Sequence, residues 1–122
     1  EHLKFSEQHG WVKAEGTWAT VGMTDFAQAE LGEIVFVELP NVGDHIVSGR
    51  PYGSVESVKT VTELYAPITG KVVRVNEALI AEPGRINTSP YEDGWLLVVE
   101  MSDPGELGQL WSAAQYRETY ET

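Results

Sequence analysis

Two segments of the chain are strongly apolar, and both are predicted to form strands in the core. In residues 34–39, apolar side chains occupy both odd and even positions, which indicates a strand that is buried on both faces and ends at Pro40. Residues 94–101 form the second apolar segment, with apolar side chains on one face at Trp95, Leu97, Val99 and Met101. The core is therefore expected to be mainly β-structure.

Shorter and more polar strands are predicted around these two segments. They cover residues 17–23, several short stretches within residues 46–65, and residues 73–76, where apolar and polar side chains alternate. Turn-forming composition marks residues 41–44 and 66–70. Residues 3–12 give no clear periodicity and are expected to be a short lead-in, and residues 85–93 are expected to form a loop.

Short helices are predicted at the periphery of this β core. Thr24 is a good N-cap for a helix that Gly32 ends, and Asn76 is expected to cap a helical turn that runs to Ile80. Two more helix starts follow, at Asp103-Pro104 and at the capping box formed by Ser112 and Gln115. The last helix carries Tyr116 and Tyr120 four residues apart, so both tyrosines can pack it onto the core.

Length, charge and residue usage narrow the functional classes. A chain of 122 residues is expected to be a single domain, residues 1–122, without room for a separate catalytic module. Its 19 acidic and 8 basic residues give a net charge of −11, which disfavours nucleic acid and anionic lipid and favours basic partners. With no cysteine and no apolar run near the ~18 residues of a membrane span, disulfides, thiolate chemistry and membrane insertion are not expected.

The recognised patterns of catalytic and metal sites are missing from the sequence. The three histidines lack metal-ligand spacing, no glycine-rich phosphate loop opens a helix, and no nucleophile is paired with a base. The tryptophans are interpreted as core or cleft-wall residues, namely Trp11, Trp18, Trp95 and Trp111. No metal and no enzymatic activity are therefore predicted.

Lys59 is the candidate functional residue. It is one of four lysines and lies in a predicted β-hairpin between β-branched Val58 and Thr60, with Glu56 three residues upstream. A lysine on a hairpin is exposed on a rigid support, where a modifying enzyme can attach a prosthetic group. The spacing alone is weak evidence, because most lysines in short polar strands are solvated surface residues.

The segment Glu56-Ser57-Val58-Lys59, followed by residues 65–70 and 75–77, resembles the lipoyl-lysine region of the H protein of the glycine cleavage system. Residues 21–28, 31–40 and 87–95 are similar to further blocks of that family, in the same order, so the resemblance extends essentially from end to end. Biotin carriers usually place Met on both sides of their lysine. Val58 and Thr60 therefore favour a lipoyl carrier.

The resemblance implies a mainly β, lipoyl-domain-like barrel-sandwich hybrid with short peripheral helices, including a C-terminal helical segment. It implies a carrier without catalytic activity, with lipoate attached to Lys59 by a lipoate ligase or lipoyltransferase that recognises Glu56, Ser57 and Val58. The carrier would shuttle the aminomethyl group of glycine from glycine decarboxylase to a tetrahydrofolate-dependent aminomethyltransferase, and dihydrolipoyl dehydrogenase would reoxidise it. A monomer is expected, in the bacterial cytoplasm or, if the source is eukaryotic, in the mitochondrial matrix.

In this family the loaded arm can fold back into a cleft on the carrier, and the resemblance implicates Glu63 and His9 in that docking. Glu63 would pair with the amine of the cargo, although a solvated carboxylate on a strand edge is an equal alternative. Gly10 departs from the family pattern, which commonly has an acidic or small polar residue between the histidine and Trp11. Docking is therefore expected to be weaker or differently built.

Two other functions stay open at this point. One is a carrier of the same fold for another lipoate-dependent system, such as sulfur oxidation or lipoyl transfer to 2-oxoacid dehydrogenases, which the departure at Gly10 keeps open. The other is an unmodified binding module, which the intact segment 56–59 disfavours. The intact blocks 24–28 and 31–40 favour glycine cleavage over the other lipoate-dependent systems.

Overall fold

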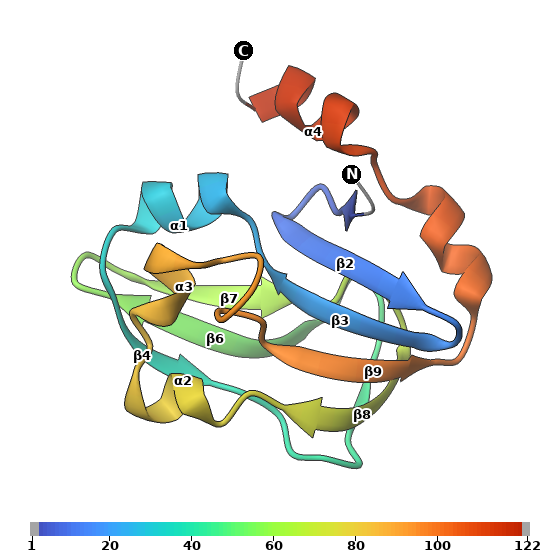
Figure 1. The fold of residues 1–122 in the computed structure, drawn as a ribbon, viewed down its shortest axis with the longest axis horizontal. Helices are drawn as coiled ribbons and strands as arrows, with labels where there is room; N and C mark the ends of the chain where they lie inside the picture. The colour runs from blue at the N-terminus through green and yellow to red at the C-terminus, as the bar shows by residue number, and fades with distance from the viewer. Residues whose placement is uncertain (1–2, 121–122) are drawn as a thin grey trace.

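The computed structural model describes residues 3–120 and contains two antiparallel β-sheets that pack face to face (Figure 1). The larger sheet contains, in spatial order, β1 (Lys4–Phe5), β2 (Gly10–Glu15), β3 (Trp18–Met23), β9 (Leu97–Met101), β8 (Gly70–Val75) and β5 (His45–Ile46). The smaller sheet contains β4 (Ile34–Glu38), β6 (Pro51–Ser57) and β7 (Val61–Tyr65). The sheets do not close into a barrel, and the predicted mainly β sandwich with peripheral helices is confirmed.

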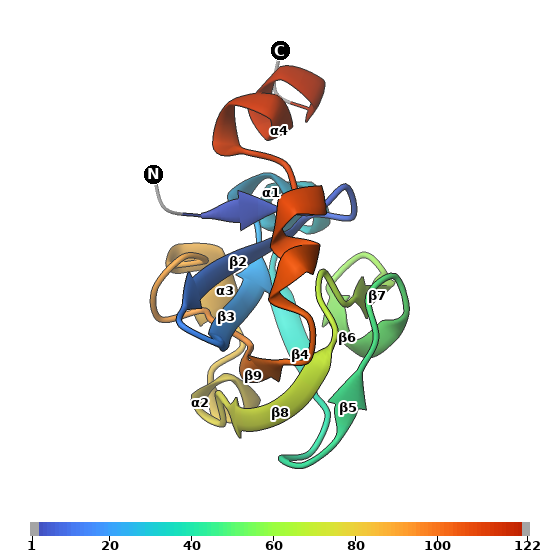
Figure 2. The ribbon, with the colours of Figure 1, turned by 90° about the vertical axis from the view of Figure 1, so that its right-hand side faces the viewer.

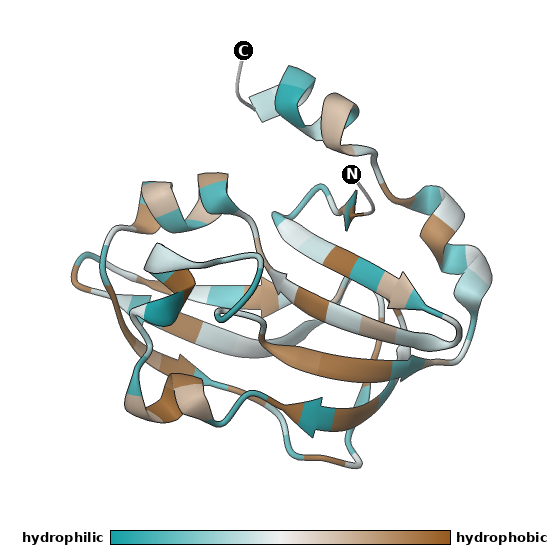
Figure 3. Cartoon of the chain, in the orientation of Figure 1, coloured by the Kyte–Doolittle hydropathy of each residue, from teal (hydrophilic) through white to brown (hydrophobic). Residues whose placement is uncertain are grey.

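The core lies between the two sheets and is filled by their inward-facing apolar side chains. Val21, Val99 and Val72 come from neighbouring strands of the larger sheet, and Val37 and Val55 face them from the smaller one. Figure 3 shows hydrophobic residues running along β9, which lies in the middle of the larger sheet. β9 is therefore one of the two middle strands of this sheet, and the prediction that its apolar segment lies in the core is confirmed.

The prediction that residues 34–39 are buried on both faces is wrong. Ile34 and Val37 are buried, but 45% of Val35 and 53% of Phe36 are exposed. A register shift between Ile34 and Phe36 interrupts the alternation of β4, which leaves two consecutive side chains exposed. The apolar run therefore includes two side chains that point into solvent.

Three further predictions about strands are corrected. The expected lead-in at residues 3–12 contains β1 and the first half of β2, and β1 pairs with β2 at the edge of the larger sheet. The strand expected from Gly94 begins only at Leu97, and Trp95 instead packs in a second apolar cluster with Arg74 over its ring. Trp18 was expected in a core or cleft wall, but it is 47% exposed.

The first predicted helix is confirmed with both of its caps. α1 (Asp25–Leu31) begins after Thr24, whose hydroxyl oxygen accepts a hydrogen bond from the Ala27 N–H at 3.2 Å. It ends at Gly32, which has a φ of 83°. This left-handed conformation strains other residues much more than glycine, so Gly32 is suited to terminate the helix.

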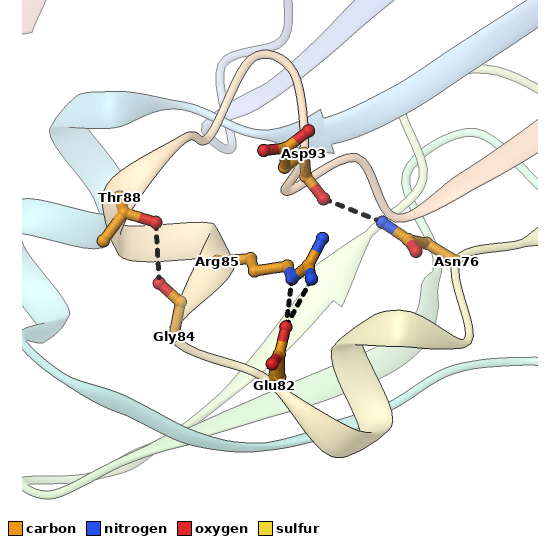
Figure 4. A network of polar contacts seen from close by, with 6 residues as sticks. All are labelled: Asn76, Glu82, Gly84, Arg85, Thr88 and Asp93. Atoms are coloured by element: carbon orange, nitrogen blue, oxygen red, sulfur yellow. Dashed lines mark hydrogen bonds and ion pairs between the residues drawn. The ribbon is translucent and has the colours of Figure 1, made fainter.

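Asn76 does not cap a helix, contrary to expectation. The helical turn α2 (Ala78–Ala81) begins after Glu77, and the Asn76 amide instead donates to the carbonyl oxygen of Asp93 at 2.9 Å (Figure 4). It also donates to the carbonyl oxygen of Trp95, at 2.7 Å. The segment expected to be a loop also contains a further helical turn, α3 (Arg85–Thr88). Asn76 therefore ties the segment that follows α3 to the end of β8.

The C-terminal part of the chain forms a 3₁₀ helix, η1 (Pro104–Gln109), and then α4 (Ala113–Tyr120). The predicted capping box of α4 is confirmed, because the Ser112 N–H donates to the Gln115 side chain and the Gln115 N–H donates to the Ser112 hydroxyl. Figure 2 shows α4 at the end of the molecule that also carries α1 and β1. No helix within residues 3–120 is long and apolar enough to cross a membrane.

Candidate functional site

Lys59 lies at the tip of the hairpin that joins β6 to β7, and this tip is held by its own hydrogen bonds. The Ser57 N–H donates to the Thr60 carbonyl at 2.8 Å. The Ser57 hydroxyl oxygen accepts the N–H groups of Lys59 at 3.1 Å and Thr60 at 3.2 Å. The Val58 N–H donates to the Glu33 carbonyl at 3.0 Å, which fixes the tip to the start of β4. The backbone is thus held in place while the Lys59 side chain is exposed.

The Lys59 side chain lies against the C-terminal end of α1. Its Nζ donates to the Glu30 carbonyl at 3.4 Å, and a Cβ at Gly32 would lie only 3.2 Å from the Lys59 Cε. The last carbonyls of a helix have no partner within the helix and carry partial negative charge, so they attract a cation. Gly32 thus ends α1 and also leaves room for the lysine stem.

Beside this contact is a cavity of about 140 Å³ between α1, β7 and the segment that precedes β2. Apolar side chains form much of its wall: Met23, Phe26, Ala27, Leu31 and Leu64. The polar side chains around it include His9, Glu30, Glu63, Tyr52 and Tyr65. The cavity therefore combines apolar walls with two carboxylates and one imidazole.

His9 is held tightly at the wall of this cavity. Its φ of 70° is unusual for a residue other than glycine, and its Nδ1 lies 2.6 Å from the hydroxyl of Tyr116 on α4. The ring packs against the rings of Phe26 and Tyr120, at centroid distances of 5.5 and 4.6 Å. Burial lowers the pKa of His9, and the nearby Glu30 carboxylate opposes this effect. The imidazole is therefore mainly uncharged at neutral pH.

Glu63 lies on β7 opposite Ser54 of β6, and its carboxylate is exposed. It accepts a hydrogen bond from the Tyr65 hydroxyl at 3.2 Å, and this bond raises the pKa of Tyr65. Glu63 lines the cavity as well, so it is both a solvated strand carboxylate and a group that a cation in the cavity can approach.

The structure brings together three of the residues that the sequence singles out. Glu63 and His9 line one cavity, and Lys59 contacts the helix that forms part of its wall. Glu56 does not line this cavity and lies on the smaller sheet between Phe36 and Val61. In the hairpin, Ser57 supports the turn and Val58 is exposed.

Sequence reasoning missed or left open two residues that line the cavity and one residue that contacts His9 in its wall. Glu30 lies one helical turn after Phe26, so both face the cavity, and this i, i+4 spacing is a signal that could have identified it. Gly10 also lines the cavity but contributes no side chain, and its N–H donates to the Ser6 hydroxyl at 2.9 Å. Tyr116 was expected only to pack α4, and its contact with His9 joins residues 107 positions apart.

The chemistry that these residues allow is binding rather than catalysis. Lys59 offers an accessible amine, and the cavity offers apolar surface with carboxylates at its margin. Within residues 3–120, no group of histidine, aspartate or glutamate side chains is arranged to hold a metal ion. The apolar walls fit an alkyl chain with a sulfur ring at its end, and the carboxylates fit a cation.

Comparison with known proteins decides the family. The family model for the glycine cleavage H-protein matches residues 3–122.

The chain belongs to the glycine cleavage H-protein family.

Curated relatives agree with this assignment. A glycine cleavage system H protein from Halalkalibacterium halodurans is 60% identical over 116 residues, which are 95% of this chain and 91% of the relative. Another from Bacillus licheniformis is 59% identical over 118 residues, covering 97% of this chain and 93% of the relative.

A solved structure supports the fold as well. The crystal structure of a glycine cleavage system H protein from Mycobacterium marinum superposes with a TM-score of 0.91 at 35% identity, covering 99% of this chain and 98% of that one. The predicted lipoyl-domain-like barrel-sandwich fold is thereby confirmed, with the sheets left open.

Family membership confirms the predicted role. This H protein is a carrier without catalytic activity in the glycine cleavage system, and its cofactor is lipoate attached covalently to a lysine. Membership also implies that it interacts with glycine decarboxylase and aminomethyltransferase. The resemblance in sequence is therefore confirmed at the level of family, cofactor and pathway.

Proposed function

We propose that Lys59 is the lysine that carries lipoate, and that the segment Glu56-Ser57-Val58 is recognised by the lipoate ligase or lipoyltransferase. The observation that carries this proposal is the position of the Lys59 amine, which is exposed on a fixed hairpin and lies beside a largely apolar cavity. When bound, lipoate supplies a disulfide on which the aminomethyl group of glycine can be carried. The contributions of this chain are to present the arm and to shelter it.

Acylation of Lys59 changes its contact with α1. The Nζ now donates to the Glu30 carbonyl as an ammonium group, and the helix end favours that charge. An amide at this position has no charge, but it keeps one N–H that can still donate to the same carbonyl. Modification therefore weakens the hold of α1 on the side chain, which frees the arm to reach partner enzymes.

The cavity is the docking place of the arm in this proposal. Met23, Leu31 and Leu64 are suited to contact the alkyl chain and the sulfur ring, because burying apolar surface is favourable. Glu63 is suited to attract the amine of the cargo, and His9 is suited to accept or donate a hydrogen bond without adding a positive charge. Closing this site around the cargo would exclude water.

The remaining partners follow from the same role. We expect dihydrolipoyl dehydrogenase to reoxidise the carrier, and residues 1–122 to act as one domain and as a monomer. The net charge of −11 supports partners with basic contact surfaces. The bacterial relatives support the cytoplasm as the compartment.

Replacing Lys59 with Arg tests the proposal, because Arg keeps the charge and much of the stem but cannot be lipoylated. Lys71→Arg is the matched control, since Lys71 is also an exposed lysine in a β-rich region. Both variants are incubated with lipoate ligase, weighed by intact mass, and assayed for glycine–bicarbonate exchange with glycine decarboxylase. We expect Lys59→Arg to lose both the mass shift and the exchange, and Lys71→Arg to keep both. A mass shift that survives in Lys59→Arg would refute the assignment.

A further inference from the structure

The C-terminal helix α4 reaches the arm cavity through one buried side chain. Tyr116 is almost fully buried and stacks on Phe5, at a centroid distance of 5.1 Å. Its hydroxyl lies 2.6 Å from His9 Nδ1 and 2.7 Å from the Thr24 hydroxyl. Tyr116 thus connects the N-cap of α1 to the imidazole at the cavity wall, although α4 itself contributes no residue to that wall.

One order of protons satisfies the three groups around the Tyr116 hydroxyl and leaves the imidazole as an acceptor. The Ala27 N–H donates to the Thr24 oxygen at 3.2 Å, and in this order the Thr24 hydroxyl proton is donated to the Tyr116 oxygen. The Tyr116 proton is then available for His9 Nδ1. In this order Nδ1 is the acceptor and the ring proton of a neutral imidazole is on Nε2.

We propose that Tyr116 is a positioning residue of the arm cavity, whose hydroxyl holds His9 in the Nε2–H tautomer and in a fixed orientation at the cavity wall. This rests on the proposed function, in which the cavity receives the lipoyl arm. Through this bond the C-terminal helix becomes a support of the docking site.

The charges around His9 explain why the charge and the orientation of its ring matter for binding the cargo. Glu30 on α1 acts on the ring electrostatically, and Glu63 on β7 lines the same cavity, so the site attracts a cation such as the amine of the cargo. The hydroxyls of Tyr116 and Tyr120 come from α4, and only that of Tyr116 bonds the imidazole. A neutral ring in a fixed position does not compete with the cargo for these carboxylates. A cationic ring would compete with it.

Two matched variants separate this role from simple packing. Tyr116→Phe removes the hydroxyl and keeps the ring that stacks on Phe5. Tyr120→Phe is the control, because it removes a hydroxyl from the same helix that donates to the Glu7 carbonyl, and its ring also packs on His9. The first measurement is the pair of ring ¹⁵N shifts of His9 in the unmodified chain, which report the tautomer.

The second measurement is the rate at which the aminomethyl-loaded carrier releases its cargo into water without aminomethyltransferase. We expect Tyr116→Phe to lose the Nε2–H preference and to release the cargo about 2- to 10-fold faster, the range for one lost hydrogen bond. Tyr120→Phe should match the unaltered chain in both measurements. If Tyr116→Phe does not fold, the ring ¹⁵N shifts of His9 in the unaltered chain decide: the Nε2–H tautomer is expected, and an Nδ1–H tautomer, in which the ring would donate to the Tyr116 oxygen, would overturn the proposal.

If Tyr116→Phe folds, either of two results would overturn the proposal. An unchanged His9 tautomer in Tyr116→Phe would show that the hydroxyl does not position the ring. A changed tautomer with an unchanged release rate would show that the ring does not matter for the cavity. Failure of the proposed function appears separately, as the absence of a lipoyl group on Lys59, and the tautomer of the unmodified chain then decides the positioning claim.

Discussion

The turn at residues 57–60 and the turn at residues 66–70 each join two short strands, yet they lie in opposite surroundings. Val58 is 64% exposed in the first turn, whereas Ile68 is 0% exposed in the second. The first is held by the hydroxyl of its own Ser57. In the second, the Thr69 N–H and hydroxyl both donate to the Glu106 carboxylate, 37 residues away, at 2.7 and 3.0 Å.

This difference supports the proposal that Lys59 is the modified lysine. The first turn satisfies its backbone groups with its own Ser57 and with one bond to the adjacent Glu33, so Lys59 at its tip stays exposed and accessible to other proteins. The second turn is covered by η1 and contributes apolar surface to the core. A lysine there would be buried and beyond the reach of a ligase.

The largest expected effect that tests this contrast is a loss of core packing in the second turn. Ile68→Ala removes a fully buried side chain, so the free energy of unfolding should fall by about 2–5 kcal/mol. Val58→Ala in the hairpin should change it by less than about 0.5 kcal/mol, because Val58 is exposed. Urea unfolding of both variants measures the difference. Equal losses would contradict the assignment of one turn to the core and the other to solvent.

A smaller effect is expected at the tie between the second turn and η1. Glu106→Ala removes the acceptor of both Thr69 bonds and leaves a partly buried N–H without it, which should cost about 1–3 kcal/mol. Glu82→Ala is the control, since Glu82 forms an exposed ion pair with Arg85 that is worth little. The same urea titrations compare them. An equally large loss of unfolding free energy in Glu82→Ala would show that the Thr69–Glu106 hydrogen bonds stabilise the fold no more than an exposed ion pair does.

The smallest expected effect is local to the hairpin. Ser57→Ala removes the oxygen that accepts two backbone N–H groups, which should cost about 1 kcal/mol and loosen the tip. Amide hydrogen exchange should therefore accelerate at Lys59 and Thr60 and stay unchanged at Thr69. Faster exchange at Thr69 as well would mean that the two turns are coupled and that the effect of Ser57 is not local to the hairpin.

Predictions from the sequence succeeded where the determining contacts are local. The caps of α1 at Thr24 and Gly32 and the capping box at Ser112 each depend on residues within a few positions. The exposure of Phe36 could not be predicted, because an apolar run does not reveal which sheet face is left uncovered. Likewise, the sequence does not show that the Asn76 amide bonds Asp93, since that contact depends on how the segment after α3 returns.

The same distinction between local and long-range contacts applies to the residues of the candidate site. Lys59, Glu63 and His9 were identified through a family resemblance, and the cavity that Glu63 and His9 share exists because α1 and β7 form its walls. Glu30 had only a local helical spacing to indicate it, and Tyr116 reaches His9 from the other end of the chain. Such contacts follow from tertiary packing, which no short motif encodes.

The central claim is that Lys59 is the lipoylated residue. Its most direct test is peptide mapping by mass spectrometry of the chain coexpressed with lipoate ligase in the presence of lipoate. We expect one lipoyl amide, located on Lys59, with Lys4, Lys13 and Lys71 unmodified. A lipoyl group on one of these other lysines, or none with a ligase that is shown to be active, would contradict it.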